Sequence, residues 1–296
     1  MSAPEAGAAP RGPESWRPLE LVRWTATYFG RHGVATPRLD AEVLLAHVLG
    51  CQRLDLYLRF EQPVEARERE RFRALIQKRA LERVPVAYLT GEREFWSRSF
   101  AVTPDVLVPR PETETLVRAV LDRAPLRALD FGTGSGVIAA AVALESPATQ
   151  ILALDRSRAA LAVAAANFVR HGLRERVALV CADRLSALAA RFDLIVANPP
   201  YVATSDLERV APELRHEPRV ALDGGADGLD VVRRLVEEAP PRLLPGGWLL
   251  LEVGAGQAMV VAALLGSAGA SQREVIRDLA GIERVVAGRF GEALAA

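Results

Sequence analysis

The chain has 296 residues, of which 50% are hydrophobic and 25% charged, the composition of a soluble globular protein with enough chain for two domains. Its 37 basic and 37 acidic side chains give a formal net charge of zero, which argues against broad non-specific binding to nucleic acid or an anionic membrane. The two cysteines lie far apart without a CxxC or CxxH companion, so neither a zinc site nor a disulfide framework is indicated.

The first segment is rich in Ala, Pro and Gly and has no apolar core of signal-peptide length. A run of about 18 apolar residues, as a transmembrane helix needs, occurs nowhere in the sequence. We therefore expect a disordered tail over residues 1–16, no membrane partner, and a cytoplasmic protein.

Helical patterns follow, and we predict a small helical, substrate-docking domain over residues 17–91. Thr36 and Pro37 have the pattern of a helix N-cap and first helical residue, and Gly50 ends the apolar stripe that follows them. A second helix is expected over residues 64–83, where apolar positions alternate with dense mixed charge. That charge is either a solvated helix face or a docking surface for a macromolecular partner.

The pattern changes between residues 92 and 109, which are rich in aromatic and branched side chains. A Thr-Pro-Asp turn at residues 103–105 lies within this segment. The segment therefore predicts a short β-hairpin that links the helical domain to a second domain over residues 110–296.

The second domain alternates apolar runs with helical patterns. Helices are expected at residues 135–144 and 158–170. This alternation is typical of βαβ units, so we predict an α/β fold with a doubly wound sheet, which binds ligands at the carboxyl ends of its strands. The apolar runs expected to form strands are residues 126–131, 150–155, 176–181, 192–197 and 248–253.

A glycine loop directly follows the first of these strands and is the first part of a candidate cofactor site. Its glycines allow a tight turn and let a ligand approach bare backbone at the start of a helix. Taken alone, the loop is also compatible with an ordinary strand-to-helix turn. The loop residues predicted to contact a cofactor are Phe131, Gly132, Thr133, Gly134, Ser135 and Gly136.

Two acidic residues extend this site toward a nucleoside. Asp155 ends the second strand, where a carboxylate can accept hydrogen bonds from two ribose hydroxyls. Asp183 follows the third strand, where it can reach an adenine amino group or, alternatively, cap a helix. The GxGxG spacing lacks the third glycine of the dinucleotide fingerprint GxGxxG, which favours S-adenosylmethionine over a dinucleotide.

The motif Asn198-Pro199-Pro200-Tyr201 follows the fourth strand. It can be a simple turn, but loops beside a nucleoside site often carry function. An amide nitrogen is a poor nucleophile because its lone pair is delocalised. If the Asn198 side-chain oxygen and the Pro199 carbonyl each accept one N–H of a substrate NH2 group, the lone pair is directed at a reactive methyl group. The prolines stiffen this corner, and Tyr201 can pack on the planar substrate, so Asn198, Pro199 and Tyr201 are predicted to be catalytic, with no metal required.

With these motifs in place, the chain resembles the HemK/PrmC family of protein-glutamine N5-methyltransferases. Three further segments carry the resemblance, at residues 85–96, 108–114 and 217–228. The resemblance implies a seven-stranded, Rossmann-like methyltransferase domain whose last strands form a reversed hairpin. It also implies S-adenosylmethionine as cofactor, S-adenosylhomocysteine as product, and class I peptide-chain release factors as partners, methylated on the glutamine of their Gly-Gly-Gln motif.

The resemblance also implies roles for individual residues. By motif position, Asn198 contacts the cofactor, and the glutamine pocket is formed by Asn198, Pro199, Pro200 and Tyr201. Some relatives carry an aromatic residue where this chain has Arg184, so a cofactor contact there lacks a stacking ring.

The segment at residues 110–114 resembles the release-factor enzymes more than their cousins that act on a ribosomal protein. Its charged residues Arg110 and Glu114 are predicted to bind substrate at the site entrance. Acidic residues at a helix start are the alternative explanation for Glu114.

Rival functions remain open from the sequence. A methyltransferase acting on adenine N6 of nucleic acid would use the same corner, but it normally needs a basic surface, so no direct nucleic-acid substrate is expected. A nicotinamide-dependent dehydrogenase is supported only by the glycine loop and Asp155. A glutamine of a ribosomal protein is an alternative substrate, and a non-catalytic translation partner is a further alternative. We expect a monomer.

Overall fold

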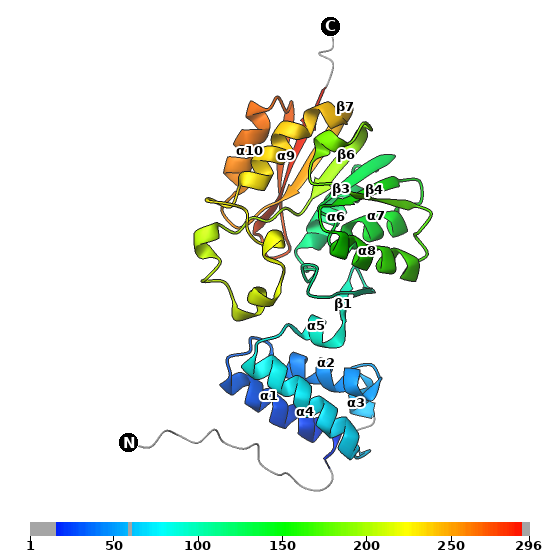
Figure 1. Ribbon diagram of the computed structural model, residues 1–296, viewed down its shortest axis with the longest axis vertical. Coiled ribbons are helices and arrows are strands. Elements are labelled where there is room, and N and C mark those ends of the chain that lie inside the picture. The colour runs from blue at the N-terminus through cyan, green and yellow to red at the C-terminus, as the bar shows by residue number, and fades with distance from the viewer. Residues whose placement is uncertain (1–15, 59–60, 292–296) are drawn as a thin grey trace. The chain divides into compact units, whose positions relative to one another are not determined.

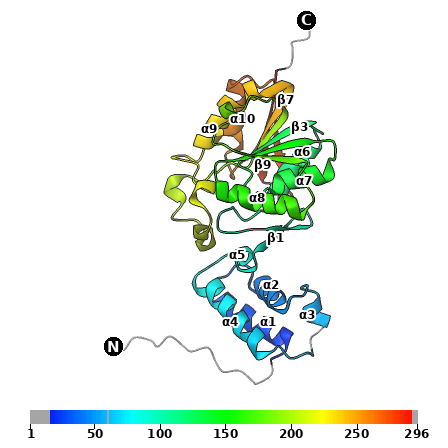
Figure 2. The ribbon, with the colours of Figure 1, turned by 45° about the vertical axis from the view of Figure 1, so that its right-hand side comes forward.

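The computed structural model describes residues 16–58 and 61–291. All but the last residue of the expected tail lies outside this range. Trp16 is described, and its carbonyl accepts a 2.8 Å hydrogen bond from the Val64 amide. The chain divides into two compact units, one ending at Thr90 and the other starting at Gly91 (Figures 1 and 2). Among the described residues, no helix is long and apolar enough to cross a membrane.

The described part of the first unit is helical. Thr36 is the N-cap of α2, and Gly50 ends that helix in the left-handed conformation with φ of +61°, as the sequence predicts. The core contains the fully buried rings of Phe29 and Phe72. The helices are α1 (Pro18–Arg31), α2 (Pro37–Leu49), α3 (Asp55–Leu58), α4 (Ala66–Leu81) and α5 (Val86–Thr90).

A buried ion pair ties α4 to α2. Arg79 Nε lies 2.7 Å from Asp40 Oδ2, and the two side chains are 7% and 8% exposed. A charge without a partner is costly to bury, so the pair fixes how these two helices pack. The mixed charge of α4 is therefore not all solvated, since one of its arginines faces the core.

The second unit starts with the predicted hairpin, β1 (Glu92–Phe95) and β2 (Arg98–Ala101). The predicted Thr-Pro-Asp turn forms after β2, where the Val106 amide donates to the Thr103 carbonyl at 3.1 Å, so it is not the turn that joins the two strands. The chain instead reverses at Trp96 and Ser97, with φ of +52° and +56°. Left-handed residues at both turn positions match the strand twist, and a 2.9 Å bond from the Trp96 amide to Glu114 Oε1 supports this conformation.

The hairpin precedes a seven-stranded sheet with the order β5-β4-β3-β6-β7-β9-β8. β9 runs antiparallel to β7, which confirms the reversed hairpin that the family resemblance implies. β3 lies between β4 and β6, so the strand order changes direction there, and such switch points are where open α/β sheets bind ligands. The strands are β3 (Arg127–Phe131), β4 (Gln150–Asp155), β5 (Val177–Cys181), β6 (Phe192–Ala197), β7 (Leu243–Glu252), β8 (Gln272–Arg277) and β9 (Glu283–Phe290).

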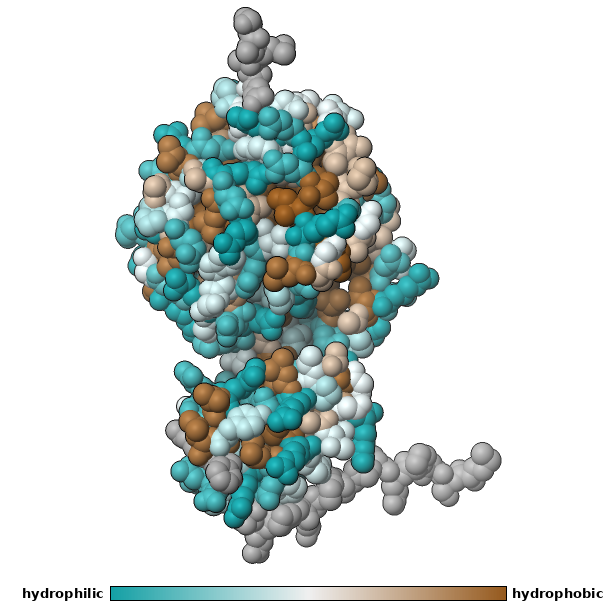
Figure 3. All heavy atoms as spheres, turned by 180° about the vertical axis from the view of Figure 1, so that it is seen from behind, coloured by the Kyte–Doolittle hydropathy of each residue, from teal (hydrophilic) through white to brown (hydrophobic). Residues whose placement is uncertain are grey.

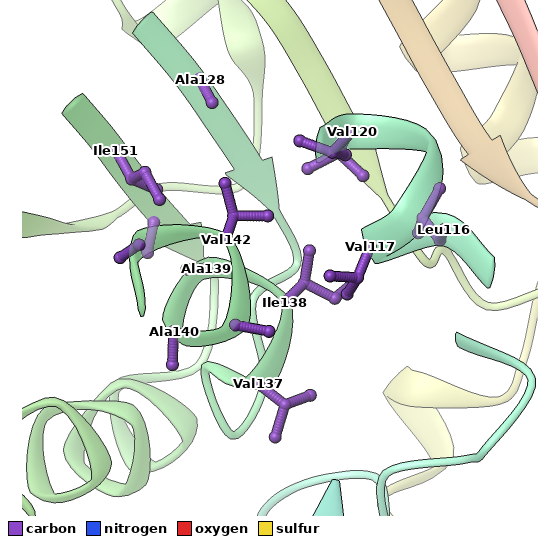
Figure 4. Packing of buried hydrophobic residues seen from close by; sticks show 14 of the residues in the cluster. Leu116, Val117, Val120, Ala128, Val137, Ile138, Ala139, Ala140, Val142 and Ile151 are labelled. Atoms are coloured by element: carbon purple, nitrogen blue, oxygen red, sulfur yellow. The ribbon is translucent and has the colours of Figure 1, made fainter. Parts of the chain in front are cut away.

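Helices cover both faces of the sheet (Figure 1). On one face α6 packs on α7, and Figure 4 shows Val117 of α6 beside Ile138 of α7. Neighbouring strand residues serve opposite faces, since Ala128 belongs to this cluster and Leu129 to the other. In Figure 3, hydrophilic and apolar residues are interspersed on the visible surface of the second unit. The helices are α6 (Thr113–Leu121), α7 (Val137–Glu145) and α8 (Arg158–Arg170) on one face and α9 (Asp230–Glu238) and α10 (Ala258–Ser267) on the other.

Candidate functional site

A pocket in the second unit lies at the carboxyl ends of β3, β4 and β6. Of the residues predicted from the sequence, Gly136, Arg184, Tyr201 and Glu114 do not line it. Those that do are Arg110, Phe131, Gly132, Thr133, Gly134, Ser135, Asp155, Asp183, Asn198, Pro199 and Pro200. The structure thus brings the glycine loop and the Asn-Pro-Pro corner to one cavity.

The glycine loop connects β3 to α7 with a backbone that only glycine adopts freely. Gly132, Gly134 and Gly136 have φ of +70°, +55° and +82°. A Cβ on Gly136 would lie 2.8 Å from the Phe168 ring, so this glycine also lets α8 pack against the loop. Gly136 therefore shapes the pocket from behind rather than lining it.

Asp155 supports the loop and faces the pocket at the same time. Its Oδ2 accepts a 2.9 Å hydrogen bond from the Gly134 amide, and its Oδ1 accepts one of 2.8 Å from the Ser157 amide. Each carboxylate oxygen can accept more than one hydrogen bond. Asp155 is therefore able to bind ligand hydroxyls while holding the loop.

Asp183 and Arg184 point to different surroundings. Asp183 lines the pocket. Its Oδ1 lies 3.5 Å from Arg156 Nη1, and its Oδ2 lies 3.6 Å from Arg234 Nη1. The helix-cap alternative for it is not what the structure shows, because the short 3-10 turn that follows has Arg184 at its N-cap position and no side-chain cap. Arg184 is 60% exposed and pairs with Glu238 of α9 at 3.1 Å.

Two acceptor oxygens of the Asn198-Pro199 corner have no hydrogen-bond partner among the residues that the structure describes. Asn198 Nδ2 donates a 3.2 Å hydrogen bond to Thr113 Oγ1. Within the described part of the chain, neither Asn198 Oδ1 nor the Pro199 carbonyl accepts a hydrogen bond. Because both residues line the pocket, these oxygens are available to an N–H donor bound there.

The segment at residues 217–228 holds this corner in place. The amide of Val202 donates to the Leu222 carbonyl at 3.0 Å, and the Gly224 amide donates to the Val202 carbonyl at 2.8 Å. A Cβ on Gly228 would lie 2.3 Å from the Tyr201 carbonyl oxygen, so this glycine permits the close approach. Burial, followed by the charge of Glu252, raises the pKa of Tyr201.

Arg110 and Glu114 are separated by the structure. Arg110 lines the pocket and forms an ion pair with the buried Glu217, whose Oε2 also accepts from the Val108 amide at 3.2 Å. Burial raises the pKa of Glu217, and Arg110 opposes that shift. Glu114 instead accepts the Trp96 amide at the hairpin turn.

Sequence reasoning missed two buried carboxylates beside the site. Asp130, 1% exposed, accepts hydrogen bonds from Thr133 Oγ1 at 2.6 Å and the Ala139 amide at 3.2 Å, and burial raises its pKa to about 6. Glu252, 2% exposed, ends β7, and burial raises its pKa to about 7. The available signal was an acidic residue inside an otherwise apolar strand pattern.

Comparisons with solved structures agree with this fold. The hMettl16 catalytic domain in complex with a MAT2A 3'UTR hairpin superposes with a TM-score of 0.54 at 15% identity, covering 77% of this chain and 84% of that one. At this identity the likeness concerns the fold alone.

Sequence comparisons are more specific. The PrmC N-terminal domain family matches residues 20–91, and the methyltransferase small domain family matches residues 111–268. The release factor glutamine methyltransferase of Geobacter sulfurreducens is 44% identical over 283 residues, which cover 94% of this chain and 99% of that protein. The one from Bordetella pertussis is 47% identical over 258 residues, covering 85% and 94%. With the pocket and its Asn-Pro-Pro corner, these matches show that the chain is a methyltransferase of the release factor glutamine methyltransferase family.

Proposed function

We propose that this enzyme transfers a methyl group from S-adenosylmethionine to the side-chain amide nitrogen, N5, of the glutamine in the Gly-Gly-Gln motif of class I peptide-chain release factors. The observation that carries the proposal is a pair of acceptors, Asn198 Oδ1 and the Pro199 carbonyl, that have no partner in the described part of the chain and belong to residues lining the same pocket as the glycine loop. The names of the relatives support release factors as the substrate.

The pocket has the groups that S-adenosylmethionine requires. Asp155 offers its carboxylate to ribose hydroxyls, and the glycine loop leaves backbone open to the ligand. Asp183 lies where it can accept an N–H from adenine. When bound, the cofactor supplies a methyl group activated by a sulfonium sulfur.

The Asn198-Pro199 corner provides for the substrate. Two acceptors at fixed positions bind both hydrogens of a carboxamide NH2 group and turn its nitrogen lone pair toward the methyl carbon. The prolines restrict the backbone, so the Pro199 carbonyl is already oriented before the substrate arrives. A strong base is unnecessary, since the proton leaves after the nitrogen has gained its fourth bond.

The cofactor assignment predicts which of two variants, Asp155→Ala or Asp183→Ala, loses more affinity for S-adenosylhomocysteine. Asp155→Ala removes an acceptor for the ribose and a support of Gly134, so we expect its affinity for S-adenosylhomocysteine to fall by roughly 10- to 100-fold, as for hydrogen bonds to a charged group. Asp183→Ala, whose carboxylate is 46% exposed, should lose less than Asp155→Ala. Titration calorimetry measures both, and equal losses would contradict the assignment.

The substrate assignment is tested by mass spectrometry of a release factor after incubation with the enzyme and labelled S-adenosylmethionine. We expect a single added methyl group on the glutamine of Gly-Gly-Gln, and none when that glutamine is replaced. The rival substrate is adenine N6 in nucleic acid. Label in oligonucleotides but none in the release factor would establish that rival and end the proposal.

The helical domain at residues 17–91 is proposed to dock the release factor, and α4 carries the exposed arginines Arg67, Arg71 and Arg73. Replacing these three with glutamine is expected to raise the KM for the release factor and leave cofactor affinity unchanged. An unchanged KM would show that this face of α4 is only a solvated surface.

A further inference from the structure

Behind the Asn198-Pro199 corner lies a buried carboxylate that the proposed reaction does not use. Glu252 ends β7, next to β6, whose residue Ala197 pairs with Leu251 and directly precedes Asn198. The side chain is 2% exposed, and its Oε2 has no hydrogen-bond partner among the described residues. Burying a carboxylate without full pairing is costly, so its presence here calls for a functional reason.

We propose that Glu252, together with Thr113, is a positioning residue that holds the Asn198 side-chain amide with its oxygen directed to the substrate. The inference rests on the proposed function, because it assigns a role within the same site.

The contacts define the orientation. Thr113 is 3% exposed, and its Oγ1 accepts a hydrogen bond from Asn198 Nδ2 at 3.2 Å. The side chains of Thr113 and Asn198 both lie close enough to the Glu252 carboxylate to lower its pKa, against the effect of burial. Since Thr113 Oγ1 uses a lone pair for Asn198, its one hydrogen is free to be donated to the neighbouring Glu252 carboxylate.

An ionised carboxylate accepts hydrogen bonds and cannot donate them. Asn198 must therefore present its NH2 side to Glu252, and its oxygen faces the other way. The opposite orientation would place the amide oxygen against the carboxylate. A neutral Glu252 removes this constraint, because its O–H can donate a hydrogen bond to the Asn198 amide oxygen. The amide can then also lie with its oxygen facing Glu252.

The charges around Glu252 come from several elements. Arg284 of β9 favours ionisation, whereas Glu112, just before α6, opposes it. Tyr201 also lies within electrostatic reach. Burial is the largest influence and raises the pKa of Glu252 to about 7. Turnover supported by the ionised form should be present above that pH and lost as the pH falls through it.

The experiment measures methyl transfer to a release factor between pH 6 and pH 9. For the wild type we expect kcat to rise through about pH 7, with cofactor affinity nearly constant. Glu252→Gln keeps the shape but not the charge, so kcat at pH 8 should fall about tenfold, the size of one lost hydrogen bond, and the rise near pH 7 should disappear. The matched control is Glu237→Gln, on the exposed side of α9, which should keep the wild-type profile.

A second pair of variants tests the hydroxyl. Thr113→Val should lower kcat about as much as Glu252→Gln, and Thr113→Ser should restore it because the hydroxyl returns. A Glu252→Gln enzyme with wild-type kcat and the same rise near pH 7 would overturn the inference. Its failure is distinct from that of the proposed function, which would be seen as an inactive wild type on any release factor.

Discussion

Asn198→Ala is expected to bind the cofactor and to lose most of its methyl transfer. The substitution removes one of the two acceptors of the corner and leaves the glycine loop and Asp155 in place. Removing one such preorganised group costs about 100- to 1,000-fold in kcat, or roughly 3–4 kcal/mol of transition-state stabilisation. Single-turnover methylation of a release factor measures the loss, and calorimetry with S-adenosylhomocysteine checks that the site is otherwise intact.

Asn198→Asp is the informative companion variant. It keeps an acceptor oxygen at the same place, but it puts a second carboxylate against Glu252 and Thr113 in a buried setting. Like charges in such a setting favour protonation of one of them, so this variant should also be slow near neutral pH. If Asn198→Ala kept turnover within threefold of the wild type, the orienting role of Asn198 would be wrong.

The sequence was most informative where an element is buried on both sides. The five predicted strands and the two predicted helices of the α/β domain were confirmed to within a few residues at most ends, except that β7 starts at Leu243. Its start contains Pro245, Gly246 and Gly247, which have the pattern of a turn rather than a strand. β8 was missed by pattern because most of its residues are exposed at the sheet edge, which leaves no apolar run to detect. β9 was also missed although it is largely buried, because its apolar run at residues 285–287 is short and lies between Arg284 and Gly288.

The residues of the site also differ in how far the sequence predicts them. The residues that line the pocket come from short motifs at strand ends, where local sequence and topology together fix their place. Partners joined only by tertiary packing were not predictable. Thr113 is 85 positions from Asn198, and no periodicity relates either of them to Glu252. The turn that joins β1 to β2 was not predicted for a similar reason, since the bond from the Trp96 amide to Glu114 Oε1 links residues 18 positions apart.

Gly228→Ala is expected to disable the corner, although Gly228 does not itself line the pocket. The added Cβ would lie 2.3 Å from the Tyr201 carbonyl oxygen, a backbone atom that cannot rotate away, so the chain next to Asn198 and Pro199 must shift. The glycine also has φ of +79°. We expect a loss of about 1–2 kcal/mol from the left-handed backbone and about 1–3 kcal/mol from overpacking. A shift near 1 Å in the acceptors costs about 100-fold in kcat.

Gly269→Ala separates the effect of the left-handed backbone from the effect of the contact with the Tyr201 carbonyl oxygen. Gly269 has a similar φ of +90°, but a Cβ there would meet no atom of the described residues within 4 Å. It should therefore lose about 1–2 kcal/mol of stability by thermal unfolding and keep wild-type kcat. If Gly228→Ala matched it in both respects, the contact with Tyr201 would not matter for the reaction. A kcat that falls only in Gly228→Ala, with cofactor affinity retained, would instead link the 217–228 segment to the geometry of the two acceptors.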